Sequence, residues 1–280
     1  MKFQAAQLYN LTCTNFKAKA IKLPTDWSQP SGDPDGKQYP DAFKITERMV
    51  PPGVNMLFLA ASTNKYHVDA QKRLHSDFDK YIDGITKAIC AAQGQWQDAA
   101  MFTVGIINGP SCNITPASLQ GPPLGPLILA NNPPMATPQE IKYTNAIANA
   151  IGTAWQAWQL GVMGTLMYPP TFAFMTSPVH PPTPNIPLPI AAMSSSGESM
   201  LSGSSLKGLM VSNLGDPQAL HHADLFDSLG NAFNTVFTSW KPATMITGLN
   251  GTGPIPSFAP PYVPGGPVAG GAVIPCPCLK

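Results

Sequence analysis

One pattern of residues recurs three times along the chain, and it limits the possible folds more than any other feature. Each copy is anchored by a tryptophan, at Trp96, Trp158 and Trp240. Apolar or small residues precede each anchor by four, seven, eight, eleven and fifteen positions. Those intervals trace one face of an α-helix. The pattern therefore predicts three equivalent amphipathic helices of about four turns, each ending near its tryptophan.

The most apolar of these positions form the predicted core of the three repeats. In order along the chain they are Ile85, Ile89, Trp96, Ile147, Ile151, Trp158, Leu229, Phe233 and Trp240. The common spacing also continues beyond the helices, because a methionine follows each anchor by five residues and a proline follows it by twenty. Helical periodicity alone could align three unrelated helices, but a shared spacing that outlasts the helix indicates an internal triplication.

Proline-rich segments follow each predicted helix, with the sequences GPPLGPLILA, PPTPNIPLPIAA and PPYVPGGPVAGG. Proline has no N–H to donate, so such arms favour polyproline II or the edges of sheets over central strands. Short strands are expected at Thr103–Ile107 and Thr244–Thr247. The predicted fold class is mainly α with extended proline-rich arms, completed by irregular and short β structure.

The spacing of the anchors suggests how the chain is divided. Trp96 and Trp158 are 62 residues apart and Trp158 and Trp240 are 82 apart, and the difference matches the Ser/Gly-rich stretch Ser194–Ser205 with its flanks. We therefore expect an N-terminal region at 1–70, repeats at 71–131, 132–192 and 214–275, a linker at 193–213 and a cysteine-containing tail at 276–280. One repeat cannot bury its own helix face, so the three helices should pack together. A pseudo-three-fold core and a linear stack both satisfy this requirement.

Charged residues are scarce and unevenly placed. They form 11% of the chain, against about 25% in typical domains. Residues 1–100 hold 12 of the 16 Lys and Arg and 10 of the 15 Asp and Glu, which leaves nine charges for the last 180 residues. That surface is either neutral and solvated or covered by other subunits, and the composition favours the second interpretation. The net charge of +1 gives no reason to expect nucleic acid as a partner.

A membrane-associated or pore-forming protein is the alternative in a different class. Residues 146–168 form a run of 23 residues without a charge, which is long enough to cross a bilayer. However, the run contains Asn149, Gln156 and Gln159, and the equivalent helices carry charges. We therefore interpret it as a buried helix of a soluble fold and expect no membrane partner. Met1–Lys17 also lacks the apolar run of a secretory signal.

Histidines and carboxylates cluster at one place, before the third predicted helix. His221, His222 and Asp224 could begin a metal or hydrolase site, with Asp227 as a further ligand at helical spacing. A carboxylate at a helix start is also explained by the helix dipole. The first helix is preceded by the similar run at His75–Asp79, whereas the second has a Thr-Pro-Gln-Glu cap without histidine. We therefore expect neither a catalytic residue nor a bound metal or cofactor, and a metal protein built on this cluster remains the third hypothesis.

The remaining motifs indicate no chemistry. The five cysteines include no CxxC pair, so free thiols in a reducing compartment are favoured over zinc. Cys276 and Cys278 could alternatively bind a soft metal or link to another chain. Asp33–Gly36 begins like a calcium loop but has no closing glutamate, which indicates a plain turn. No phosphate-binding glycine loop occurs.

The third proline-rich tail, Gly251–Gly271 (GTGPIPSFAPPYVPGGPVAGG), follows an Ala/Asn-containing helix. It resembles stretches in tail and baseplate proteins of contractile phages and related contractile injection systems. The resemblance implies a structural subunit of a virion or injection particle that is assembled in the cytoplasm, and no catalytic residue is implied. Together with the repeats and the low charge, it predicts a pseudo-symmetric adaptor or packing element. The expected partners are other subunits of the particle, with trimeric or hexameric symmetry.

Overall fold

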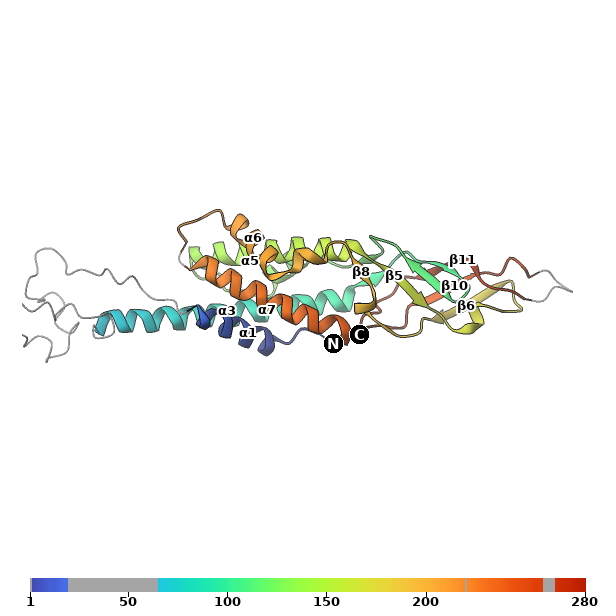
Figure 1. Ribbon diagram of the computed structural model, residues 1–280, viewed down its shortest axis with the longest axis horizontal. Coiled ribbons are helices and arrows are strands. Elements are labelled where there is room, and N and C mark those ends of the chain that lie inside the picture. The colour runs from blue at the N-terminus through green and yellow to red at the C-terminus, as the bar shows by residue number, and fades with distance from the viewer. Residues whose placement is uncertain (1, 20–64, 220, 259–264) are drawn as a thin grey trace, which may run out of the picture.

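The computed structural model describes residues 2–19, 65–219, 221–258 and 265–280. The molecule is elongated, with helices in one half and strands in the other (Figure 1). Most of the predicted N-terminal region at 1–70, including the turn at Asp33–Gly36, lies outside the described residues.

In the described ranges, three inner helices and three outer helices alternate in the helical half. The inner helices α3 (Lys65–Ala99), α5 (Pro138–Gly161) and α7 (His222–Ala243) carry the anchor tryptophans. Among the outer helices, α4 (Leu124–Ala130) contacts α3 and α5, and α6 (Gly203–Leu214) contacts α5 and α7. The N-terminal helix α1 (Ala5–Ala18) contacts α7 and α3 and so completes the cycle. Each outer helix thus covers the boundary between two inner helices.

The helix starts follow from local chemistry. Thr137 caps α5 with a capping box, in which its hydroxyl accepts from the Glu140 N–H and the Glu140 carboxylate accepts from the Thr137 N–H. Pro138 occupies the first turn, where its missing N–H costs nothing. Helix α3 begins earlier than the sequence pattern suggests, so His75–Asp79 lies inside this 35-residue helix rather than before it.

The strand half contains a seven-stranded sheet in the order β6-β10-β11-β2-β3-β5-β8, and every neighbouring pair is antiparallel. Two small two-stranded sheets join β1 to β4 and β7 to β9. The strands are β1 (Met101–Phe102), β2 (Ile106–Asn108), β3 (Ser111–Ile114), β4 (Leu119–Gln120), β5 (Val162–Met167), β6 (Val179–Pro184), β7 (Leu188–Pro189), β8 (Ser194–Ser195), β9 (Met245–Ile246), β10 (Asn250–Pro254) and β11 (Ala269–Ile274).

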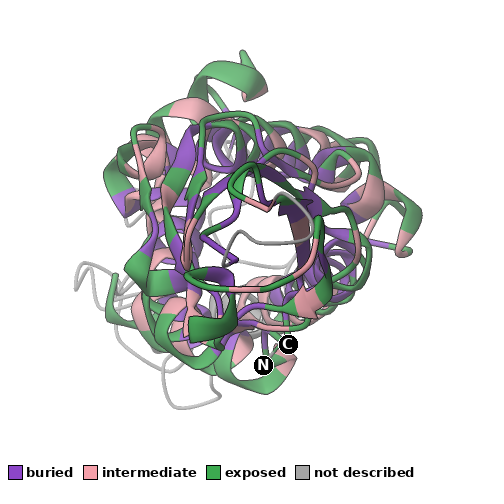
Figure 2. Ribbon diagram, turned by 90° about the vertical axis from the view of Figure 1, so that its right-hand side faces the viewer, coloured by how far each residue is buried: buried purple, intermediate pink, exposed green. Residues whose placement is uncertain are grey.

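The links between the three strand segments are cyclic, although the ladder itself is open between β5 and β6. The strands β2 and β3 follow α3, β5 and β6 follow α5, and β10 and β11 follow α7. Ladders join β2 to β3 and β10 to β11, whereas no ladder joins β5 to β6. Between these segments, β3 bonds to β5, β6 bonds to β10 and β11 bonds to β2, so each segment contacts both others. Viewed along the long axis, the ribbon runs around this axis in a ring (Figure 2). The ladder order begins at β6, which contains Pro181, Pro182 and Pro184 and can donate few N–H groups.

The segment that follows each inner helix, which we call its arm, contacts the backbone at the C-terminal end of another inner helix. In the first arm, the Ala117 N–H donates to the Leu160 carbonyl at 2.7 Å, at the end of α5. In the second, the Ile190 N–H donates to the Thr244 carbonyl at 2.8 Å, just beyond α7. In the third, Pro277 forms a bridge with Met101, just beyond α3. The three arms are therefore interlocked, and none of them folds only on its own helix.

The predicted fold class is wrong, because the described residues form a mixed α/β fold rather than a mainly α protein with proline-rich arms. Within the described ranges the prolines fall mostly in connections and in β6, while Gly, Ala, Val and Ile supply the N–H groups of β11. Glycine is also required where strands approach closely. A Cβ on Gly253 would lie 2.5 Å from the Cα of Gly271.

The segment at 193–213, which its composition marked as a linker, contains β8, the 3₁₀ helix Glu198–Leu201 and α6. Its serines make specific contacts. The Ser195 hydroxyl donates to the Trp158 carbonyl at 2.7 Å, and the Ser202 hydroxyl caps α6 by accepting from the Ser205 N–H. The Ser/Gly composition therefore reflects capping and close packing.

We predict opposite effects for two glycine-to-alanine substitutions within helices. In Gly152→Ala on α5, the new methyl group would lie 2.8 Å from the Gly125 nitrogen of α4, so we expect destabilisation of about 1–3 kcal/mol. The control Gly208→Ala on α6 adds a methyl group with no atom within 4 Å, and helix propensity should stabilise it by about 0.5–1 kcal/mol. Urea unfolding followed by circular dichroism measures both. Equal effects of the two substitutions would show that α4 does not pack closely on α5.

Candidate functional site

The anchor tryptophans meet at the centre of the molecule, where the helical half joins the strands. Their ring centroids are 5.9 Å apart for Trp96 and Trp158, 5.8 Å for Trp158 and Trp240, and 6.4 Å for Trp96 and Trp240. The structure buries all nine predicted core residues: Ile85, Ile89, Trp96, Ile147, Ile151, Trp158, Leu229, Phe233 and Trp240. They belong to one hydrophobic core.

Three aromatic residues outside the repeat pattern, Trp155, Phe237 and Phe3, also belong to this cluster, and the Phe237 ring lies 5.3 Å from that of Trp158. Trp155 lies 4.9 Å from both Trp96 and Trp158, and Phe3 lies 5.9 Å from Trp240. Trp155 precedes an anchor by three residues, so helical periodicity within α5 could have identified it. Phe3 carried no such signal, because it reaches the cluster from the N-terminal segment. The Trp155 indole N–H has no hydrogen-bond partner among the described residues and is surrounded by aromatic rings.

Two buried glutamines accept hydrogen bonds from anchor tryptophans of neighbouring inner helices. The Trp96 indole N–H donates to the Gln159 side-chain oxygen at 2.8 Å, and the Trp240 indole N–H donates to that of Gln97 at 2.9 Å. Each glutamine directly follows the anchor tryptophan of the helix it belongs to. The third equivalent position is Lys241, which has no acceptor. Its ammonium instead pairs with Glu198 and lies 5.4 Å from the centroid of the Phe237 ring.

Charged residues are concentrated in the helical half of the molecule and absent from the strands. Residues 99–139, 143–197 and 242–279 contain no Asp, Glu, Lys or Arg, and these ranges include every strand. All ion pairs given for the described residues join positions in the helical half or at its boundary, for example Lys142 with Asp216 at 2.9 Å. The strand half is thus neutral because it lacks charged side chains, and not because opposite charges cancel.

Large apolar side chains are exposed on this neutral half. In the strands and their connections they are Val104, Ile106, Met163, Met167, Phe174, Val179, Ile186 and Ile274. Only four others are exposed in the described residues, namely Met135, Ile141, Leu160 and Val211. Phe174 reaches 57% exposure, which is unusual for an aromatic ring on a folded domain. A neutral surface with exposed apolar residues is the structural feature that most clearly calls for a partner.

The histidine cluster is engaged in local contacts. His221 precedes α7 with a φ of 54°, and burial lowers the pKa of its imidazole. The His222 Nδ1 lies 2.6 Å from the Ala219 carbonyl. Asp227 pairs with Lys19 at 2.5 Å and Lys207 at 3.3 Å, and the hydrogen bond from Lys19 is the main reason that its carboxyl pKa is lowered. In the described part of the chain, no group of three or more His, Cys, Asp or Glu could hold a metal.

A further histidine, His180, is buried inside the strand half. Its ring stacks on Phe172 with centroids 3.8 Å apart. The Nδ1 lies 2.8 Å from the Pro181 carbonyl, and the Nε2 lies 3.1 Å from the Thr171 hydroxyl. Both nitrogens are therefore committed to local hydrogen bonds, and neither is positioned as a base for a substrate.

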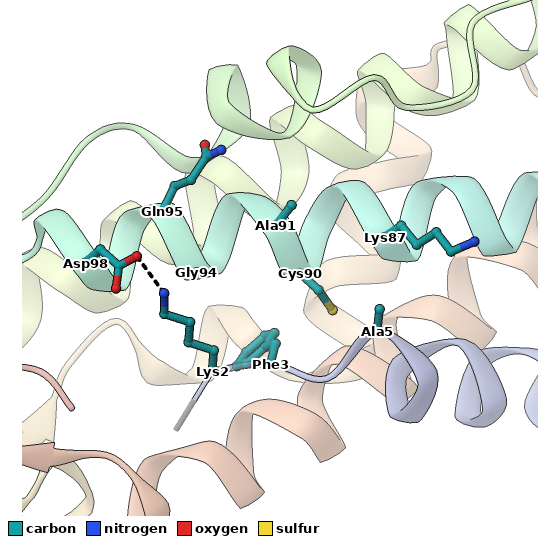
Figure 3. A pocket seen from close by; sticks show the side chains of 9 residues that line it. All are labelled: Lys2, Phe3, Ala5, Lys87, Cys90, Ala91, Gly94, Gln95 and Asp98. Atoms are coloured by element: carbon teal, nitrogen blue, oxygen red, sulfur yellow. Dashed lines mark hydrogen bonds and ion pairs between the residues drawn. The ribbon is translucent and has the colours of Figure 1, made fainter.

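A hollow of about 400 Å³ lies between the N-terminal segment and α3 (Figure 3). Its polar groups are already paired: Lys2 with Asp98 at 2.5 Å, and Lys87 with Asp83 at 2.6 Å. Burial raises the pKa of the Cys90 thiol, which also lines the hollow, to about 12. The thiol is therefore protonated and a poor nucleophile at neutral pH. The arrangement combines no acid, base and nucleophile.

No helix in the described ranges is long and apolar enough to span a membrane. The uncharged run at 146–168 is divided between α5 and β5. No protein family, curated protein or solved structure matches the chain.

The buried Trp–Gln hydrogen bonds should stabilise the fold measurably. Gln159→Leu removes the acceptor of the Trp96 indole N–H at nearly constant volume, so we expect a loss of about 1–3 kcal/mol. Gln156→Leu is the matched control, since Gln156 is exposed one turn away on the same helix, and it should change stability by less than about 0.5 kcal/mol. Chemical denaturation followed by tryptophan fluorescence compares the two. Similar losses would mean that the bond does not hold the helices together.

The five cysteines should differ in reactivity. Burial raises the pKa of the Cys112 and Cys278 thiols, as it does for Cys90, to about 12, so little thiolate exists near neutral pH. Cys276 is partly exposed, and we expect iodoacetamide to modify it first in the native chain. Mass spectrometry of the labelled peptides measures this order. Cys276→Ser should remove the fast site and Cys90→Ser should not, whereas fast labelling of Cys112 would contradict the packing of the strand half.

Proposed function

We propose that this protein is a structural subunit of a large multi-protein particle, namely a phage tail or baseplate or a contractile injection system. In that particle it acts as a pseudo-symmetric adaptor or packing element. The observation that carries the proposal is the neutral strand half with its exposed apolar residues. Protein interfaces are depleted in charge and enriched in Met and aromatic residues, and this surface likewise lacks charge and exposes Met163, Met167 and Phe174 beside its aliphatic residues.

The cyclic order of the elements supports a role on a symmetry axis. In the described residues, three strand segments, three inner helices and three outer helices succeed one another around the long axis. A single chain built in this way presents three related faces, which suits trimeric or hexameric neighbours. The particle would be assembled in the cytoplasm, in keeping with the absence of disulfides between the five cysteines.

The proposal predicts how the chain fractionates from its native cells. We expect it to sediment with a high-mass particle at a fixed ratio to the other subunits, as measured by density-gradient centrifugation and quantitative mass spectrometry. Because the contacting surface carries no charge, the association should survive a wash with about 1 M salt, at which surface ion pairs are screened within about 3 Å. Recovery of the chain only as a low-mass species, or only in the membrane fraction, would refute the proposal.

A further inference from the structure

Three helices meet at an aromatic contact near the start of α7. The ring of Phe78 on α3 lies 4.9 Å from that of Phe16 on α1 and 6.0 Å from the imidazole of His221, with both distances measured between ring centroids. Phe16 is buried, and Phe78 and His221 are half-buried. We call these three residues the histidine junction. Because Phe78 contacts both partners, the state of the His221 ring affects the packing of all three helices.

The backbone fixes the place of this imidazole. His221 directly precedes α7 with a φ of 54° and a ψ of 17°, in the left-handed region that few residues other than glycine adopt. Its carbonyl accepts from the Leu225 N–H at 3.0 Å, at the start of the α7 hydrogen bonds. Its side chain makes no capping bond. The start of α7 is therefore held through the backbone of His221 and the contact of its ring with Phe78, and not through a side-chain cap.

The surroundings of His221 disfavour a charged ring. Burial is the largest cause that lowers the pKa of this imidazole, and His75 on α3 lowers it further. The ring also lies at the N-terminal end of α7, where the helix dipole is positive. Asp224 in the first turn of α7 acts in the opposite direction, but the pKa stays below its ordinary value.

The charged groups that α1 brings to this place are already paired. Lys17 pairs with Asp79 of α3 at 3.8 Å, and Lys19 pairs with Asp227 of α7 at 2.5 Å. The hydrogen bond from Lys19 is the main reason that the pKa of the Asp227 carboxyl is lowered, so this carboxylate keeps its charge in mild acid. Histidine is the side chain that ordinarily titrates between about pH 5 and 8.

We infer that the histidine junction is a pH-sensitive contact, through which mild acid loosens the start of α7 from α3 and α1. A charged imidazole has to be hydrated, and the half-buried site beside Phe78 provides little water. Opening the first turn of α7 hydrates the ring without unfolding the rest of the chain, since helix ends open at a lower free energy than the core.

The direction of the pH dependence follows from the lowered pKa of His221. The ordinary pKa of histidine is about 6.5, so the open form of the junction binds a proton more tightly than the closed form. The contact is therefore at full strength above about pH 6.5, and its stability is lost progressively as the pH falls below that value.

Hydrogen exchange of the full-length chain, followed by mass spectrometry, tests this contact. After correction for intrinsic exchange, the amides of residues 225–229 in α7 should lose protection at least about threefold between about pH 7.5 and about pH 5.5. Amides of residues 147–155, in the middle of α5, are the internal reference and should keep their protection.

Two substitutions should change this loss in opposite directions. His221→Asn keeps a residue that tolerates the left-handed conformation and does not titrate, so it should abolish the loss and preserve protection at about pH 7.5. Asp224→Asn removes the carboxylate that favours the charged ring, so it should enlarge the loss. The matched control is His222→Gln, which retains a side-chain N–H for the Ala219 carbonyl and should leave the loss unchanged.

Equal protection of residues 225–229 at both pH values in the wild-type chain would overturn the inference. A loss that persists in His221→Asn, or that disappears in His222→Gln, would also overturn it. Titration of the wild-type His221 ring by NMR guards against a folding defect in the variants, and a midpoint at or above that of histidine in an unfolded peptide would contradict the inference. All these outcomes are independent of the proposed function, because every measurement uses the isolated chain.

Discussion

The fold depends on a contact among three helices that the sequence separates by many residues. Trp96, Trp158 and Trp240 bring their rings to within 6.4 Å of one another, and glutamines from the neighbouring helices accept two of their indole N–H groups. Such acceptors stabilise a buried indole, because an unmade hydrogen bond in a dry core costs more than a made one contributes, and in this cluster the Trp155 N–H has no partner among the described residues. The cluster lies where helices become strands, so it also determines where all three arms begin.

The arms in turn fix the positions of the inner helices relative to one another. Each ends at the foot of the next inner helix, through Ala117 to Leu160, Ile190 to Thr244, and Pro277 to Met101. A change in the position of one helix must therefore move the sheet, and a change in the sheet must move the helices. This coupling explains how a chain with a fifth of its residues as proline or glycine can be ordered. The entropy lost by the arms is offset by pairings with two neighbours instead of one.

Helical periodicity was enough to predict the three inner helices and their buried faces, because an amphipathic stripe is a local signal. The sheet could not be predicted in the same way. Its pairings join distant segments, such as β11 with β2, and two of its central strands are rich in Gly, with Asn and Pro in β10, all residues of low strand propensity. The outer helices α4 and α6 were missed for a related reason. They pack through glycines, with Gly125 against Gly152 and Gly203 against Gly230, and those glycines resemble linker composition when the sequence is considered alone.

The candidate site shows the same division between local and distant information. The scarcity of charge was evident in the sequence, but its position was not, because the three neutral segments are separated by charged helices. Only the pairing of the strands collects the β-strands of these segments into one half of the molecule. The same pairing places Ile106 and Ile274, which are far apart in the chain, on neighbouring strands. Prolines protect one end of the ladder, at β6, where N–H groups would otherwise bind further strands. The prolines therefore block pairing of further strands at this edge, whereas the outward side chains of the sheet stay exposed. This arrangement favours association through the faces of the sheet over uncontrolled extension of its edge.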